Sequence, residues 1–122
     1  MNISPDAAKY LAACHNERSV RNQINARFGR IVHLLEQHGT YIGYPYVRHV
    51  RGELWEIRVD DSTGAYRLFF GIASGRTLEV ACGRTKKADR FPPGVYDWAE
   101  RTVRAYVASL DRHGHTTDRD GR

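Results

Sequence analysis

The sequence is poor in the residues and segments that mark redox proteins, metal sites and membrane proteins. Its only two cysteines, Cys14 and Cys82, lie far apart, so neither a CxxC redox pair nor a thiolate metal site can be read from them. No apolar run approaches the length of a membrane span, and the first residues lack the basic start and apolar stretch of a secretory signal. We therefore expect a cytoplasmic protein with reduced thiols and no membrane partner. The histidines have no carboxylate or cysteine companions in a recognised metal pattern, so we expect no metal and no other cofactor.

Acidic residues are scarce relative to basic ones. Nineteen lysines and arginines against fourteen acids give a net charge of +5. Such a charge favours association with a polyanion, either a nucleic acid or an acidic protein. A solvated basic surface without a partner is the alternative interpretation. The length of 122 residues suits one domain, which we place at residues 1–110, followed by a flexible tail at 111–122 that has no apolar periodicity.

Three segments have the spacing of helices that pack one side against a core. Ser4 and Pro5 have the chemistry of a helix start, which predicts a first helix to about His15. A second helix should end at Gly39, and a third should begin after the turn at 92–94. Apolar residues at three- and four-residue steps define the second and third helices: Val20, Ile24, Phe28, Ile31, Val32 and Leu35, then Val95, Trp98, Ala99, Thr102, Val103, Tyr106 and Leu110.

The middle of the chain changes to the alternating pattern of β-strands. We predict strands at 46–51, 54–59, 66–72 and 77–82, joined by short turns, and hence a four-stranded antiparallel meander. One face of this sheet should be covered by the second helix, which makes the fold class α+β. The polar segment 83–90 that follows is predicted to be an exposed loop.

Two arginines in this sheet suggest a site for an anion. If residues whose numbers sum to 125 pair across the hairpin, Arg58 stands opposite Arg67, which is unfavourable unless an anion lies between them. Together with Lys86 and Lys87 at the end of the sheet, they would suit a phosphate group. The alternative is a solvated charged face on which Glu56 pairs with Arg58.

The order of these features resembles a known family of toxins. Two helices are followed by a strand with Glu56 and Arg58, a strand with Tyr66 and Arg67, a Lys-Lys pair before a proline turn, and a closing helix. Over about residues 5 to 108, this resembles the RelE/HigB superfamily of bacterial and phage toxins, particularly its phage-derived HigB-like branch. The resemblance implies a RelE-like fold and a metal-independent, ribosome-dependent mRNA endoribonuclease, neutralised by a HigA-like antitoxin with a helix-turn-helix domain.

The resemblance also implies roles for individual residues. Arg58 and Arg67 would hold the phosphate and its transition state, and Lys86 or Lys87 would complete the charge and act as a base if its pKa is lowered. The further residues expected to bind RNA are Arg48, Arg51, Arg84 and Arg90.

The general acid remains open at this point. Related toxins often have a histidine or tyrosine near the end of the last strand, where this chain has Cys82, and an aromatic residue where it has Arg84. The substitutes considered are Tyr66, Tyr46, His49 and Arg84. Two other functions stay open as well: a non-catalytic ParE-like inhibitor of gyrase, and a basic RNA-binding module without toxicity.

Overall fold

The computed structural model describes residues 1–120, and their side chains at 1–74 and 76–110. Three α-helices and five β-strands are joined by short turns and two 3₁₀ turns. In chain order the elements are β1 (Asn2–Ile3), α1 (Pro5–Ala13), α2 (Arg18–His38), η1 (Gly39–Ile42), β2 (Val47–Arg51), β3 (Leu54–Asp61), β4 (Gly64–Ile72), η2 (Ser74–Arg76), β5 (Leu78–Lys86) and α3 (Val95–Asp120).

The five strands form one mixed sheet in the order β1-β5-β4-β3-β2. The strands β2 to β5 make the antiparallel meander that the alternation predicts. The prediction of a four-stranded, wholly antiparallel sheet is wrong in one respect, because β1 adds a parallel edge strand in which Ile3 pairs with Val80. A strand of two residues is too short to show alternation, so the sequence carries no signal for it. The class α+β holds.

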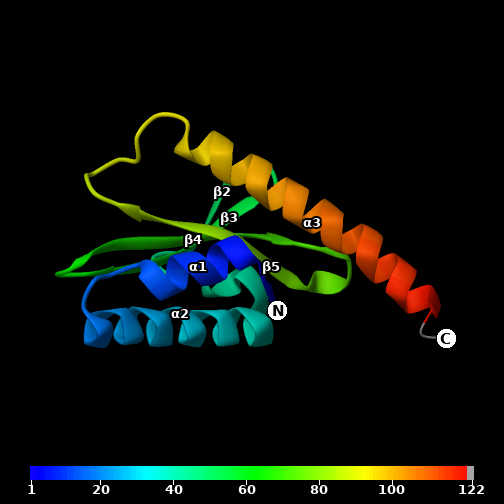
Figure 1. The fold of residues 1–122 in the computed structure, drawn as a ribbon, viewed down its shortest axis with the longest axis horizontal. Coiled ribbons are helices and arrows are strands. Elements are labelled where there is room, and N and C mark those ends of the chain that lie inside the picture. The colour runs from blue at the N-terminus through cyan, green and yellow to red at the C-terminus, as the bar shows by residue number, and fades with distance from the viewer. Residues whose placement is uncertain (121–122) are drawn as a thin grey trace.

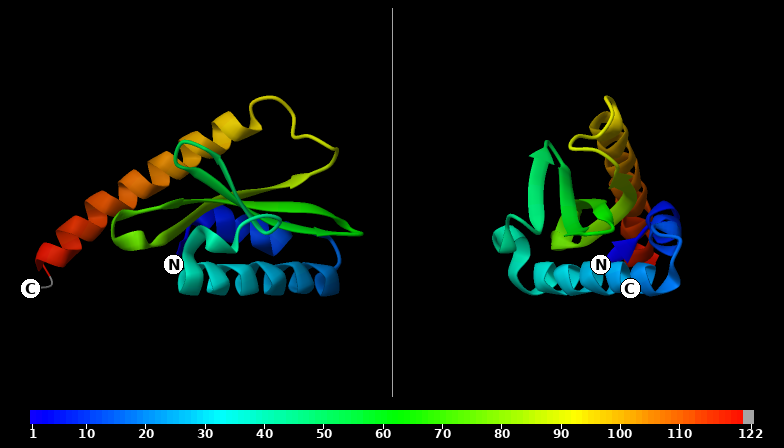
Figure 2. Two further views of the ribbon diagram at one scale, coloured as in Figure 1. Left: turned by 180° about the vertical axis from the view of Figure 1, so that it is seen from behind. Right: turned by 90° about the vertical axis from the view of Figure 1, so that its left-hand side faces the viewer.

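Helices cover both faces of the sheet, whereas the sequence argument provided for only one. Helices α1 and α2 lie on one side and α3 crosses the other side, as Figures 1 and 2 show. Each face has its own apolar cluster. The α2 side contains Phe28 and Leu35 packed with Ile57 and Phe70, and the α3 side is centred on Phe69. Side chains of both parities along the strands are therefore buried.

The predicted helix starts and stops largely hold. Ser4 is the N-cap of α1, its Oγ accepting a hydrogen bond from the Ala7 backbone NH at 3.0 Å. Helix α2 ends where Gly39 adopts a φ of 67°, a conformation that glycine adopts at little cost.

Helix α3 is longer than the apolar pattern indicates, because it continues past residue 110 to Asp120. The predicted tail at 111–122 is therefore helical up to 120. The side chains of 111–120 and residues 121–122 lie outside the described part, and the mobility of this segment stays a prediction.

Candidate anion-binding site

The strand register places three arginines in one row across the sheet. Arg58 on β3 pairs with Arg67 on β4, as the sum of 125 predicts, and Arg67 pairs in turn with Arg84 on β5. Directly paired residues present their side chains on the same face. Lys86 follows Arg84 by two residues on the same strand, so it extends this face by one further cation. We call Arg58, Arg67, Arg84 and Lys86 the cation row.

The cation row depends on the length of β5, which continues to Lys86, whereas the predicted strand ended at residue 82. The segment 83–90 was predicted as a loop, but residues 83–86 are strand and pair with β4. The pairing of this additional stretch of strand with β4 brings Arg84 beside Arg67. In Figure 1 the loop from β5 to α3 arches over this end of the sheet on the α3 side.

Carboxylates of the protein itself offset the repulsion between the first two arginines. Glu56 is fully buried, and its Oε1 accepts hydrogen bonds from Arg58 Nη1 at 3.1 Å and from Arg48 Nε at 2.8 Å. Arg67 Nη1 donates to Asp60 Oδ1 at 2.6 Å. In the alternative interpretation of the sequence, the pairing of Glu56 with Arg58 belongs to a charged face open to solvent. Here the carboxylate is buried, and it orients the guanidinium groups of Arg48 and Arg58 by accepting a hydrogen bond from each.

The members of the cation row differ in how much solvent they reach. The Arg67 side chain is 2% exposed and that of Arg58 is 15% exposed, whereas Arg84 is an exposed residue. The Nε atoms of Arg58 and Arg67 are buried without a hydrogen-bond partner among the described residues. Arg84 and Lys86 can therefore contact a ligand directly, while Arg67 adds positive charge from below. Incompletely paired buried cations favour a bound anion above them.

Aromatic side chains of α3 and its preceding loop border the cation row. The rings of Phe91, Tyr96 and Trp98 all contact Phe69 of the sheet. The guanidinium carbon of Arg84 lies 4.5 Å from the centroid of the Trp98 ring. Lys86 Nζ lies 5.8 Å from the centroid of Phe91. These contacts hold the two accessible cations against an apolar surface, which lowers the entropic cost of binding with them.

Burial and neighbouring cations act on the Lys86 amine. Its pKa is lowered from the usual 10.5, first by burial and then by the charges of Arg67 and Arg58. A lowered pKa leaves more of the amine neutral at a given pH. The shift in the pKa of Lys86 therefore has the direction that the role of a base requires.

Tyr96 is a functional candidate that the sequence argument missed. It stands in the first turn of α3, and its hydroxyl accepts a hydrogen bond from Arg48 Nη2 at 2.9 Å. Burial, followed by the charge of Glu56, raises the pKa of Tyr96, so the hydroxyl keeps its proton. Because Tyr96 contacts Phe91, which also lies under Lys86, a proton donor and a candidate base flank one aromatic ring.

Three of the predicted cations are not members of the cation row. Lys87 lines a separate pocket with Cys14 and His15, on the α1 side of the sheet. Arg51 forms ion pairs with Asp97 and Glu100 of α3. Arg90 is exposed in the loop before α3. Of the four arginines predicted to bind RNA, Arg84 is in the row and Arg48 is joined to it through Glu56, whereas Arg51 is paired with carboxylates of α3 and Arg90 is exposed in the loop that leads to α3.

The substitutes considered for the general acid are placed differently from Tyr96. Tyr66 is buried on the α2 side, with its hydroxyl against Thr63 Oγ1. The His49 ring contacts the ring of Trp55 in a tilted arrangement, and Trp55 packs on that same side. Tyr46 is exposed next to Arg58. Burial above all raises the pKa of Cys82 to about 12, which leaves its thiol a poor proton donor.

Comparison with known proteins identifies the family. Residues 18–104 match the family described as Phage derived protein Gp49-like (DUF891). This chain belongs to the Gp49-like family. The match agrees with the phage-derived part of the predicted resemblance and with a toxin of a toxin–antitoxin system in general, and it contains nothing specific to HigB. No curated protein matches the chain.

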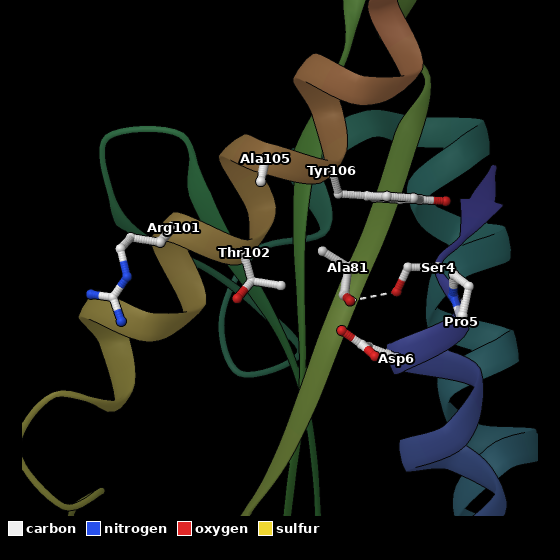
Figure 3. Close-up of a pocket in the computed structure, with 8 residues that line it drawn as sticks. All are labelled: Ser4, Pro5, Asp6, Ala81, Arg101, Thr102, Ala105 and Tyr106. Atoms are coloured by element: carbon white, nitrogen blue, oxygen red, sulfur yellow. Dashed lines mark hydrogen bonds between the residues drawn. The ribbon is translucent and has the colours of Figure 1, made fainter. Parts of the chain in front are cut away.

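Away from the cation row, the Gp49-like chain has a hollow between α1 and α3. It has a volume of about 500 Å³, with Ala81 of β5 at its floor (Figure 3). Ser4 Oγ donates a hydrogen bond to the Ala81 carbonyl across its edge. Asp6 and Arg101 contribute opposite charges to its lining. This hollow therefore lacks the single sign of charge that distinguishes the cation row.

The described part of the Gp49-like chain was searched for membrane-spanning helices and for clusters of metal-binding side chains. Among the described residues, no helix is both long and apolar enough to cross a membrane. In the same part of the chain, no three side chains of the histidine, cysteine or acidic types gather where they could hold a metal ion.

Proposed function

We propose that this Gp49-like protein is the toxin of a type II toxin–antitoxin system and inhibits translation by cleaving mRNA on the ribosome. The observation that carries the proposal is the cation row, whose Lys86 has a lowered pKa, together with the protonated hydroxyl of Tyr96 on the same side of the sheet. RNA can be cleaved when the ribose 2′-oxygen attacks the neighbouring phosphorus. The products are a cyclic phosphate and a 5′-hydroxyl. The reaction needs positive charge at the phosphorane, a base and an acid.

Each requirement has a candidate group on the α3 side of the sheet. Arg84 and Arg58 would contact the phosphate oxygens, with Arg67 stabilising the added negative charge from beneath. The neutral Lys86 amine would take the proton of the 2′-hydroxyl. Tyr96 would give its proton to the departing 5′-oxygen, and the Arg48 guanidinium would stabilise the phenolate that results.

The proposal includes a partner that blocks the cation row. A net charge of +5, with Arg84 and Lys86 accessible on one face, suits an acidic segment of the partner protein. We propose a HigA-like antitoxin with a helix-turn-helix domain, encoded by the neighbouring reading frame. Co-expression with that frame should abolish the growth arrest described below.

The decisive test compares two adjacent lysines. Expression of the wild type in bacteria should arrest growth, and primer extension should show cleaved messages. Lys86→Ala should lower the cleavage rate by about 10²- to 10⁴-fold, the usual contribution of general acid–base catalysis, and Tyr96→Phe should act similarly. Lys87→Ala removes the same charge from the opposite face of the sheet and should leave cleavage unchanged.

The proposal has two ways to fail in this experiment. If Lys86→Ala and Lys87→Ala both cleave like the wild type, the catalytic assignment is wrong. If the wild type arrests growth without cleaving messages and purified gyrase loses supercoiling activity, the ParE-like function is the correct one. Circular dichroism of each variant checks that it is folded.

A further inference from the structure

The segment between α2 and β2 exposes three tyrosines. Tyr41 is 97% exposed, Tyr44 is 71% exposed and Tyr46 is 49% exposed. Large aromatic side chains with this exposure often mark binding surfaces. This segment is anchored to β3, because the Arg58 backbone NH donates to the Tyr46 carbonyl at 2.8 Å. Its position relative to the cation row is therefore set by the sheet.

Tyr44 lies directly against the first member of the cation row. The guanidinium carbon of Arg58 lies over the Tyr44 ring, 5.1 Å from its centroid. Such a contact attracts the cation to one face of the ring. At 71% exposure, the other face is open to solvent. Arg58 in turn donates a hydrogen bond to the buried carboxylate of Glu56 at 3.1 Å, which restricts the positions that its guanidinium group can take beside the ring.

From this arrangement, we infer that Tyr44 is a nucleobase-binding residue that stacks on an unpaired base next to the phosphate held by the cation row. The inference rests on the proposed function, in which that phosphate belongs to RNA. Unpaired bases are recognised by stacking on aromatic rings, and phosphates by arginine and lysine. In a single strand each base is joined to its phosphate through one ribose. A ring beside a phosphate site therefore suits a neighbouring base.

Tyr41 supplies a matched control within the same segment. It is more exposed than Tyr44, but it lines a hollow with Leu35, Ile72 and Arg76 at the C-terminal end of α2, and no member of the cation row lines that hollow. A general contribution of exposed tyrosines to binding would involve both residues. The specific inference concerns Tyr44 alone.

Ribosomes programmed with an uncleavable message provide the test. The message carries 2′-O-methyl groups in the A-site codon, which remove the attacking hydroxyl, and one abasic nucleotide placed at each codon position in turn. For the wild type, one abasic position should weaken binding by about 5- to 150-fold, the range of a lost base–aromatic stack. Tyr44→Ala should weaken binding to the intact codon to a similar extent and become insensitive to that position. Tyr44→Phe and Tyr41→Ala should keep the wild-type pattern.

The outcomes separate this inference from the proposed function. If no abasic position weakens wild-type binding, or if Tyr44→Ala remains as sensitive as the wild type, Tyr44 does not stack on a base. Cleavage that depends on Lys86 would still support the nuclease. If the wild type does not bind programmed ribosomes at all, the proposed function and this inference are both overturned. Thermal unfolding of Tyr44→Ala should match the wild type, because the side chain is exposed.

Discussion

At the scale of single residues, the placement of Lys86 and Lys87 shows how strand parity assigns function. They are neighbours in the sequence, yet Lys86 extends the cation row and Lys87 lines a pocket on the opposite side. Lys86 is the last residue of β5 and Lys87 follows it directly, so the alternation of the strand, continued by one residue, places the two side chains on opposite faces. From the sequence, the two lysines were equivalent candidates, because the polar composition of 83–90 predicts a loop. In a loop, successive side chains do not alternate between two faces.

The environment of Lys86 leads to a titration that can be measured directly. The chain has only three lysines, so ¹³C NMR of labelled lysine side chains gives few signals, and Lys86→Arg assigns the one from Lys86. We expect that signal to titrate below the usual lysine pKa of 10.5. Removing one neighbouring cation, by Arg58→Gln, should move the pKa of Lys86 back upward, because the charged amine is then less strongly repelled. Unchanged titration in this variant would show that the row does not act on Lys86.

The same lowered pKa sets the direction of a pH dependence. A base acts in its neutral form, so cleavage should rise with pH until the pKa of Lys86 in the complex is passed, and then level off. Because Arg58→Gln raises that pKa, its cleavage should level off at a higher pH than that of the wild type. A profile that keeps its wild-type position in Arg58→Gln would argue against Lys86 as the base.

The candidate general acid, Tyr96, could not be identified from the types and spacing of residues in the sequence. Tyr96 belongs to the last helix, and its link to the site runs through Arg48 on β2 and Glu56 on β3. No spacing in the sequence connects these three positions, since the contact depends on how α3 crosses the sheet. By contrast, the pairing of Arg58 with Arg67 is one of the registers that the sequence leaves open for this hairpin, and the structure adopts it.

At the scale of elements, the fold was predictable wherever a pattern repeats over many residues. Helix α2, the β3–β4 hairpin and the start of α1 follow from periodicity and capping chemistry. The edge strand β1 and the register shift of β5 opposite Phe69 and Phe70 did not follow, because each depends on contacts between distant segments. The polar end of β5 was missed for the same reason. Its arginine and lysine carry no strand signal, and the partner strand β4 determines its conformation.

A glycine in β5 fixes how closely α1 approaches the strand. A Cβ atom at Gly83 would lie 2.2 Å from Cδ2 of the Tyr10 ring, and the Tyr10 hydroxyl is hydrogen-bonded to Thr85 at 2.9 Å. Gly83→Ala should therefore lower the free energy of unfolding by about 1–3 kcal/mol, the usual cost of overpacking. Urea denaturation measures the change.

Gly29 is the matched control for this substitution. It lies inside α2, where an added Cβ would meet nothing within 4 Å. Gly29→Ala should raise the free energy of unfolding by about 0.5–1 kcal/mol, because alanine loses less backbone entropy in a helix. If Gly83→Ala were as well tolerated as Gly29→Ala, the close packing of Tyr10 on β5 would be wrong.

At the scale of the whole molecule, the net charge differs from the positive charge that is accessible to a partner. The chain carries +5, but several arginines are ion-paired with its own carboxylates, as Arg51 is with Asp97 and Glu100. Helices cover both faces of the sheet, and accessible positive charge remains on the α3 side at Arg84 and Lys86. The basic composition predicts a polyanion as the class of partner, while the location of the proposed site depends on which cations are left accessible.

Salt dependence distinguishes these two quantities. Binding of a 2′-O-methylated single-stranded RNA should weaken as salt rises, because each neutralised phosphate releases counterions. Arg84→Ala should reduce the slope of log K against log salt by about 0.7, the contribution of one contact to a single strand. Arg51→Ala lowers the net charge by the same unit, but its guanidinium is already paired with two carboxylates, so the slope should stay near that of the wild type. Fluorescence anisotropy at several salt concentrations measures both slopes. An equal reduction in the two variants would mean that overall charge, rather than the cation row, binds the RNA.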